Sequence, residues 1–205
     1  MESNVRYPTD SSLLNEAREK LVQLLDKNDI KLRQTYRFVG KKLEYATAKY
    51  CHAKQMKRAR KSTKKLKTFL GRVVRDIERK VEKVPEKRAV FDNLLGKSKR
   101  LLAQKKDSKN KLYSLHSPET YCISKGKRRT PYEYGQKVSL VITHKHGIAL
   151  AAQTWMENVH DSKTLQGAIE KAEKISKQKV GKAFVDKGYK GHPIQNDKTQ
   201  IFISG

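Results

Sequence analysis

The chain has 205 residues, enough for one or two domains with a modest core. Its 47 lysine and arginine residues outnumber the 21 aspartate and glutamate residues, so the formal net charge is +26. An excess of one sign repels itself in a compact fold unless a polyanion lies nearby. Nucleic acid is the usual polyanion, because each neutralised phosphate releases counterions. The composition therefore favours a nucleic-acid partner over a merely basic protein.

Membrane-bound and secreted classes are not indicated. No apolar run approaches the ~20 residues of a membrane-spanning helix, and residues 1–10 lack the hydrophobic region of a signal peptide. Cys51 and Cys122 stand alone, without the CxxC spacing of a zinc site or the cysteine density of a disulfide framework. We therefore expect a protein of the reducing cytoplasm without a membrane partner.

The first half of the chain begins with the spacing of a helix. Thr9, Asp10 and Ser11 offer N-cap oxygens ahead of an apolar stripe with steps of three and four. The stripe consists of Leu13, Leu14, Ala17, Leu21, Leu24 and Leu25. Asn28 and Asp29 mark its break, so the pattern predicts a first helix that ends near residue 28.

Two further helices are expected before residue 106. A second stripe runs from Leu32 to Ala53, and after an almost wholly basic stretch it resumes at 66–84. Pro85 predicts the end of that helix, because proline disfavours the α conformation in the residue before it. A third helix is predicted from Glu86 to about residue 105. Residues 11–106 are therefore expected to form an all-helical arm of antiparallel hairpins.

The second half changes to the period of strands. Runs rich in β-branched and aromatic residues predict strands near Tyr113, at Tyr121–Ile123, at Tyr134–Thr143 and at Ile148–Trp155. The polar segment His144–Gly147 is a turn signal, and it joins the last two strands into a hairpin. This half therefore contains a sheet.

A helix and two strands follow the hairpin. Lys163–Lys177 has helical spacing, with Asp161 or Ser162 as its cap. Lys182–Asp186 and Gln200–Ser204 have the composition of short strands. The order hairpin, helix, strand, loop, strand is typical of an α/β domain with a mixed sheet and a right-handed crossover.

Asp186 is the most informative acid in the sequence. It follows an apolar strand and precedes a glycine-punctuated loop, and ligand sites in open α/β sheets gather at such strand ends. A carboxylate there, among Lys187 and Lys190, suits a Mg²⁺ ion that bridges to phosphate oxygens. His192 follows the loop, and Lys187, Lys190 and His192 are candidates for nucleic-acid contact. The alternative is an aspartate that only caps the following turn.

Other catalytic chemistry has no support in the motifs. The six histidines form no HxxxH or His/Cys ligand set, and the sequence holds neither a GxSxG elbow nor a GxxxxGK[ST] phosphate loop. Serine-triad hydrolysis, nucleotide hydrolysis and a small-molecule substrate are therefore not indicated.

Two tracts carry more positive charge than a solvated helix face requires. From Tyr45 to Arg75 there are 11 basic residues and no acid. Like charges three or four positions apart destabilise a free helix. The simplest explanation for so many of them is that bound phosphates relieve the repulsion. A second cluster lies in a predicted loop, and both tracts favour weakly sequence-specific backbone contact. The expected binding residues are Lys54, Lys57, Arg58, Arg60, Lys61, Lys64 and Lys65 in the first tract, and Lys125, Lys127, Arg128 and Arg129 in the second.

Several strings of the sequence share a resemblance and occur in a common order. They are residues 4–11 (NVRYPTDS), 113–127 (YSLHSPETYCISKGK), 131–139 (PYEYGQKVS), 158–165 (NVHDSKTL), 184–192 (FVDKGYKGH) and 201–205 (IFISG). Together they resemble the DDE-class transposases of bacterial insertion sequences, in particular the fifth insertion-sequence group. The match covers nearly the whole chain.

The resemblance implies an α/β fold in which a partial ribonuclease-H-like mixed sheet follows a long helical insertion. The arm at 11–106 would be the insertion, 107–205 the partial core, and 1–10 a remnant leading out of the first core strand. It also implies two Mg²⁺ ions held by an Asp, Asp, Glu triad that cleaves a DNA strand and transfers its 3′-hydroxyl. Asp186 matches the second aspartate, so it is expected to be a catalytic metal ligand. The implied partner is DNA at the transposon ends.

The other two acids of the triad have no counterpart in the sequence. In the family they lie before the segment that matches 4–11 and after the segment that matches 201–205, and no glutamate follows Asp186. We therefore expect a truncated transposase of the bacterial nucleoid that does not cut DNA alone. A complementing transposase fragment or a second copy of the chain would be its further partner. One alternative is a basic DNA- or RNA-binding module whose core is a non-catalytic relic. Another is an active nuclease or resolvase of the same fold, which needs a second acid near Asp186; the candidates Glu133, Asp161 and Asp197 lie on no strand that suits this role.

Overall fold

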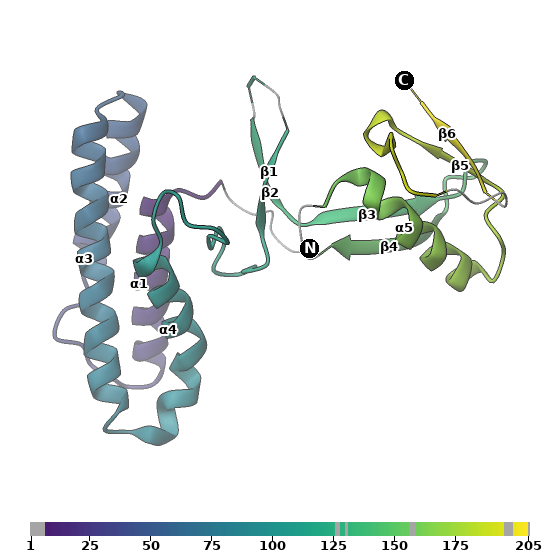
Figure 1. Ribbon diagram of the computed structural model, residues 1–205. Coiled ribbons are helices and arrows are strands. Elements are labelled where there is room, and N and C mark those ends of the chain that lie inside the picture. Colours follow the sequence, from purple (N-terminus) through teal and green to yellow (C-terminus); the bar gives the residue numbers. More distant parts are fainter. Residues whose placement is uncertain (1–6, 126–127, 130, 156–158, 195–198, 205) are drawn as a thin grey trace. The chain divides into compact units, whose positions relative to one another are not determined.

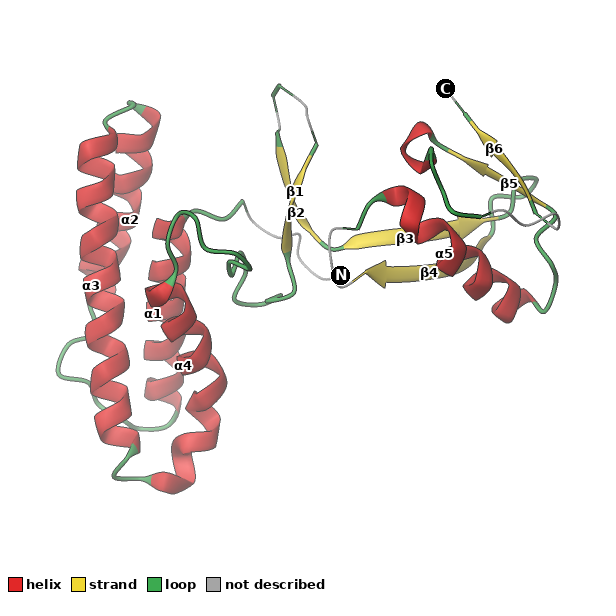
Figure 2. Ribbon diagram, in the orientation of Figure 1, coloured by secondary structure: helices red, strands yellow, loops and turns green. Residues whose placement is uncertain are grey.

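The computed structural model describes residues 7–125, 128–129, 131–155, 159–194 and 199–204, and the chain divides into two compact units (Figure 1). The first unit is Met1–Thr120 and the second is Tyr121–Gly205. Helices fill the first unit, whereas the second holds strands and a helix (Figure 2). The predicted change from helices to strands is confirmed. The helical unit ends later than the predicted boundary at residue 106, because Leu112 and Leu115 are buried in its core.

Four α-helices are described in the helical unit. They are α1 (Asp10–Lys27), α2 (Arg37–His52), α3 (Met56–Val81) and α4 (Arg88–Ala103), with the 3-10 turn η1 (Pro85–Lys87) before α4. The predicted start of α1 is confirmed with Thr9 as the N-cap. The Thr9 hydroxyl accepts from the Ser12 backbone N–H at 3.1 Å, and the Ser12 hydroxyl accepts from the Thr9 N–H at 3.1 Å. This reciprocal pair satisfies backbone donors that the first turn leaves open.

The helices α1, α3 and α4 share one hydrophobic core. Ala17 and Leu21 of α1, Leu70 and Ile77 of α3, and Phe91 of α4 are all wholly buried. Burial of a leucine, isoleucine or phenylalanine side chain contributes about 1.5–3 kcal/mol. The apolar stripes of the sequence are therefore the packing seams of this unit.

The predicted second helix is wrong as a single element, because the chain reverses within it. α2 ends at His52 and α3 begins at Met56, and between them Lys54 has a φ of 55°. At the other end of this hairpin the Tyr36 and Phe69 rings stack, with centroids 4.3 Å apart. The two apolar stripes belong to two antiparallel helices that face each other.

The α2–α3 hairpin extends past the core that α1, α3 and α4 share. α3 has 26 residues, which corresponds to roughly 39 Å at 1.5 Å per residue. Its first side chain in the shared core is Leu66, so Met56 and the nine residues after it lie beyond that core. In this stretch α3 runs beside α2, and Ala59 and Ser62 are buried (Figure 1). The projecting end of the hairpin therefore presents mostly polar side chains.

The second unit contains three pairs of strands and one α-helix among its described residues. The antiparallel pairs are β1 (Tyr121–Ser124) with β2 (Tyr132–Gly135) and β3 (Lys137–Ile142) with β4 (Ala149–Trp155); the parallel pair is β5 (Lys182–Val185) with β6 (Gln200–Ile203); the helix is α5 (Asp161–Ser176). The predicted hairpin is confirmed, and Gly147 in its turn has a φ of 65°. Glycine adopts this conformation without steric cost.

Several predictions for this unit need correction. The strand predicted at 134–143 is divided at Gln136 between β2 and β3, and Tyr113 lies in the helical unit outside any strand. The cap of α5 is His160, whose Nδ1 accepts from the Ser162 N–H at 3.3 Å. The single mixed sheet is not formed, because the described strands make three separate two-stranded sheets.

Separate two-stranded sheets leave apolar side chains uncovered. On β3, Ser139 is buried, whereas Val138, Leu140 and Ile142 are each more than half exposed. Phe184 of β5 is 54% exposed. Two strands are marginal without further packing. The sheet-bearing unit is therefore expected to be less stable than the helical unit.

Hydrogen exchange of the isolated chain should separate the two units. Amides of α3 from Leu66 to Ile77 should exchange at least about a hundredfold more slowly than those of Val138–Ile142 and Ala183–Asp186, because stability against local opening follows buried apolar contact. The measurement is amide exchange by mass spectrometry or NMR at neutral pH. Protection of the β3 and β5 amides equal to that of α3 would contradict the expectation.

Candidate nucleic-acid interface

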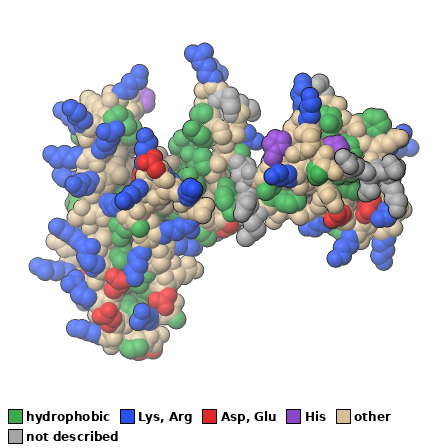
Figure 3. All heavy atoms as spheres, in the orientation of Figure 1, with side chains coloured by type: hydrophobic (Ala, Val, Ile, Leu, Met, Phe, Trp, Pro, Cys, Tyr) green, Lys and Arg blue, Asp and Glu red, His purple; other side chains and the backbone are tan. Residues whose placement is uncertain are grey.

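The first basic tract lies on the α2–α3 hairpin. All of its predicted binding residues are exposed: Lys54, Lys57, Arg58, Arg60, Lys61, Lys64 and Lys65. Lys54 occupies the turn, and the others lie on α3. Figure 3 shows lysine and arginine side chains crowded over α2 and α3. The fold therefore gathers the tract on one projecting element.

The cations of this tract have no acidic partners among the described residues. None of the 11 basic residues between Tyr45 and Arg75 forms an ion pair there. Cations elsewhere in the helical unit do: Lys20 pairs with Glu16, and Lys99 pairs with Glu78 at 2.6 Å. The projecting end of the hairpin therefore carries uncompensated charge.

Two aromatic rings accompany the tract. The Lys49 ammonium lies 4.7 Å from the centroid of the Tyr45 ring, and the Arg58 guanidinium lies 5.9 Å from that of Tyr50. The Arg58 Nη1 also donates to Gln55 Oε1 at 3.0 Å. Such contacts fix the direction of the cations, which suits recognition of a regular phosphate backbone.

The second basic cluster lies between β1 and β2. Lys125, Arg128 and Arg129 are exposed, and Lys125 Nζ pairs with Glu133 Oε2 at 3.3 Å. Lys127 lies outside the described residues. The predicted placement in a loop between strands is confirmed for the described members. Because Lys125 has a carboxylate partner, this cluster carries less unpaired positive charge than the α2–α3 tract.

Asp186 caps the loop that follows its strand. Its Oδ1 accepts from the Gly188 N–H at 2.9 Å, at the start of the short 3-10 helix η2 (Lys187–Tyr189). Lys187 and Lys190 are exposed, and His192 is half-buried with an Nδ1 that has no hydrogen-bond partner within the described part of the chain. The capping alternative for Asp186 is therefore present in the structure.

A second carboxylate reaches the same loop. A Cβ added to Gly188 would lie 2.8 Å from Asp161 Oδ2 and 3.0 Å from Asp186 Oδ1, so both acids border this glycine. Asp161 Oδ1 pairs with Lys137 Nζ at 2.7 Å. The sequence offers Asp161 both as a helix cap and as a candidate second acid near Asp186. The sequence disfavours the second role because Asp161 lies on no suitable strand, whereas the structure brings it to Gly188 from the first turn of α5. The candidate Asp197 lies outside the described residues.

The two acids do not fit a centre for two metal ions. Over the described ranges, no three side chains of histidine, cysteine, aspartate or glutamate gather where they could hold an ion. Asp186 is engaged by its own loop and Asp161 by Lys137. A clamp on two Mg²⁺ ions about 4 Å apart requires more carboxylate oxygens than this pair leaves open.

No match to known proteins was found. No family model matches the chain, and no curated protein or solved structure matches it. The described helices also include none that is both long and apolar enough to cross a membrane. The uncompensated cations of the α2–α3 hairpin are therefore the main guide to function.

Proposed function

We propose that the chain is a DNA-binding protein of the transposase type that holds DNA through its helical unit. The observation that supports DNA binding is the set of 11 cations from Lys49 to Arg75 that have no carboxylate partner among the described residues. Repulsion among them opposes folding, and a polyanion along the hairpin removes it. The transposase type is supported by the resemblance of the ordered strings 113–127, 158–165 and 184–192.

The tract suits the phosphate backbone better than the base edges. From Lys57 to Lys67, α3 rises roughly 15 Å, which spans about four phosphates of one DNA strand at 3.4 Å each. With the cations of α2 and the Lys54 turn, contact with about six phosphates is within reach. Flexible lysine side chains follow charge rather than sequence. Binding is therefore weakly sequence-specific.

No cleavage step is assigned to this chain. The resemblance implies Mg²⁺ at Asp186, but this carboxylate caps its own loop, and Asp161, which borders the same glycine, is paired with Lys137. The donor set does not fit the two-ion chemistry of strand transfer. The role proposed for the chain is to bind DNA, not to cut it.

Salt titration of duplex DNA binding tests the proposal. With about six phosphates neutralised, log K should fall with log salt at a slope of about −5. The measurement is fluorescence anisotropy of a labelled duplex between 50 and 300 mM salt, for two unrelated sequences. A slope near zero, or binding to only one of the two sequences, would contradict the proposal that the hairpin binds the phosphate backbone.

A further inference from the structure

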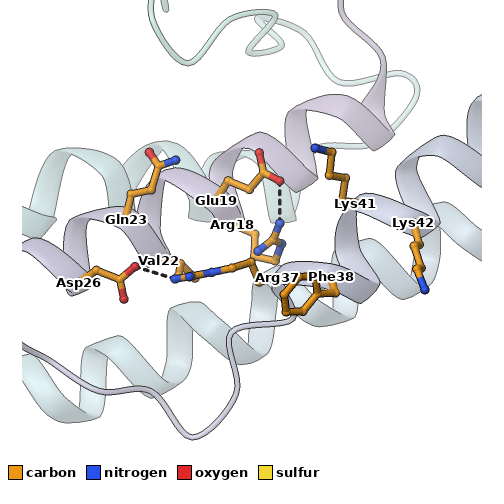
Figure 4. A pocket seen from close by; sticks show the side chains of 9 residues that line it. All are labelled: Arg18, Glu19, Val22, Gln23, Asp26, Arg37, Phe38, Lys41 and Lys42. Atoms are coloured by element: carbon orange, nitrogen blue, oxygen red, sulfur yellow. Dashed lines mark hydrogen bonds and ion pairs between the residues drawn. The ribbon is translucent and has the colours of Figure 1, made fainter.

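A cavity of about 630 Å³ lies between α1 and α2 (Figure 4). This volume is within the range of small-molecule and nucleotide sites. Four cations line it, namely Arg18, Arg37, Lys41 and Lys42, against the two carboxylates of Glu19 and Asp26. None of its residues belongs to the binding set predicted from the sequence. The excess of positive charge in the lining suits an anionic ligand.

The floor of the cavity is a fixed guanidinium. Arg18 is 1% exposed, and its Nε and Nη2 donate to Asn15 Oδ1 at 3.0 and 2.8 Å. Its Nη1 donates to the Thr35 carbonyl at 3.1 Å. Burial lowers the pKa of Arg18, and the adjacent Glu19 carboxylate opposes that change. Gly40 permits this arrangement, because a Cβ there would lie 2.7 Å from Arg18 Nε.

The wall of the cavity carries an exposed aromatic ring. Phe38 is 80% exposed, more than any other large apolar side chain in the described part of the chain. Its neighbour Tyr36 stacks on Phe69, whereas Phe38 has no ring partner among the described residues. Figure 4 shows Phe38 on α2 beside Arg37, which reaches Asp26 at 2.6 Å. An open aromatic face next to cations is the arrangement on which unpaired bases stack.

We propose that this cavity binds one unpaired nucleotide of a DNA strand, with its base stacked on Phe38 and its phosphate held by Lys41 and Lys42. The inference rests on the proposed DNA binding and adds a preference for DNA with an unpaired position. Lys41 and Lys42 have no ion pair among the described residues, so both can contact phosphate. A paired base does not offer its face to Phe38, because its neighbours in the duplex cover it.

The test uses the full chain and a duplex that carries one unpaired 2-aminopurine, whose fluorescence falls on stacking. The wild-type chain should quench it, and Phe38→Ala should abolish the quenching and weaken binding of this duplex by about 5- to 150-fold. Phe38→Trp should retain both. Because the Phe38 side chain is exposed, its removal should leave the fold intact. Val39→Ala is the matched control: Val39 is an apolar residue of α2 that is 54% exposed and lies outside the cavity.

The outcomes separate this inference from the proposed function. Unchanged quenching in Phe38→Ala, or equal loss in Val39→Ala, would overturn the cavity site while binding of a fully paired duplex persists. Loss of binding to the paired duplex in Phe38→Ala would also overturn it, because the ring would then act in general DNA contact. Quenching of free 2-aminopurine nucleotide but not of the oligonucleotide would assign the cavity to a free nucleotide. If the wild-type chain binds no DNA at all, the proposed function itself fails.

Discussion

Replacement of Lys57, Arg58, Arg60 and Lys61 with glutamine should weaken duplex DNA binding about a thousandfold at 0.1 M salt. The four exposed cations lie on the projecting part of α3 and have no carboxylate partner among the described residues. Loss of four of about six phosphate contacts should also reduce the salt slope from about −5 to about −2. Fluorescence anisotropy over a range of salt concentrations measures both quantities.

A second quadruple variant with the same change in net charge provides the control. Lys20, Lys80, Arg88 and Lys99 each pair with a carboxylate of the helical unit. Their replacement with glutamine should weaken binding by less than about tenfold, since these charges are already compensated. Equal losses in the two variants would mean that overall charge, rather than the hairpin surface, drives binding. Unchanged affinity in the first variant would indicate that DNA binds instead at the second cluster, which includes Lys125, Arg128 and Arg129.

The first variant should also be more stable than the wild-type chain in the absence of DNA. Lys57 and Lys61 are four positions apart on α3, and Arg58 and Lys61 are three apart. Each like-charge pair that is removed relieves about 0.2–0.5 kcal/mol. A gain in unfolding free energy together with a loss of DNA affinity would identify these side chains as binding residues, because a structural role predicts losses in both.

Phe91→Ala should lower the unfolding free energy of the helical unit by about 3–5 kcal/mol. Phe91 is wholly buried in the core that joins α1, α3 and α4. Loss of its ring removes apolar contact and leaves a cavity that the surrounding helices fill only in part. Because domains are stable by about 5–15 kcal/mol, much of the stability would be lost. Urea unfolding followed by circular dichroism at 222 nm measures the change.

Phe38→Ala is the matched control for this stability measurement. The same substitution at a residue that is 80% exposed should change the unfolding free energy by no more than about 0.5 kcal/mol. A loss below about 1 kcal/mol for Phe91→Ala would show that α1, α3 and α4 do not depend on one shared core.

The helices were predictable where local chemistry decides the structure. The Thr9 cap, the end of α1 and the helical segment before Pro85 follow from side chains within a few residues of each other. The reversal at Lys54 was not predictable in this way. The stripes of α2 and α3 have the same period, and no glycine or proline marks the turn between them. The chain turns at this point because α2 packs against α3, and that contact is not visible in the local sequence.

The candidate sites were predictable in part for a similar reason. The basic tract is contiguous in sequence, so its residues could be named before its position on the hairpin was known. The cavity depends on residues of two helices that meet because Gly40 admits Arg18, and no local pattern indicates such a meeting. One signal was available: Phe38 is an aromatic residue outside the apolar stripe that contains Tyr36 and Leu43.

The position of the helical unit within the chain sets the order in which the two units form during synthesis. Its core is built entirely from residues before Tyr121, so it needs nothing from the segment that is translated later. At about 5–20 residues per second, the ribosome needs several seconds to add the second unit. During that interval the α2–α3 hairpin can already be folded and able to hold a polyanion. The proposed DNA contact can therefore begin on the nascent chain, before the less well packed strands have been made.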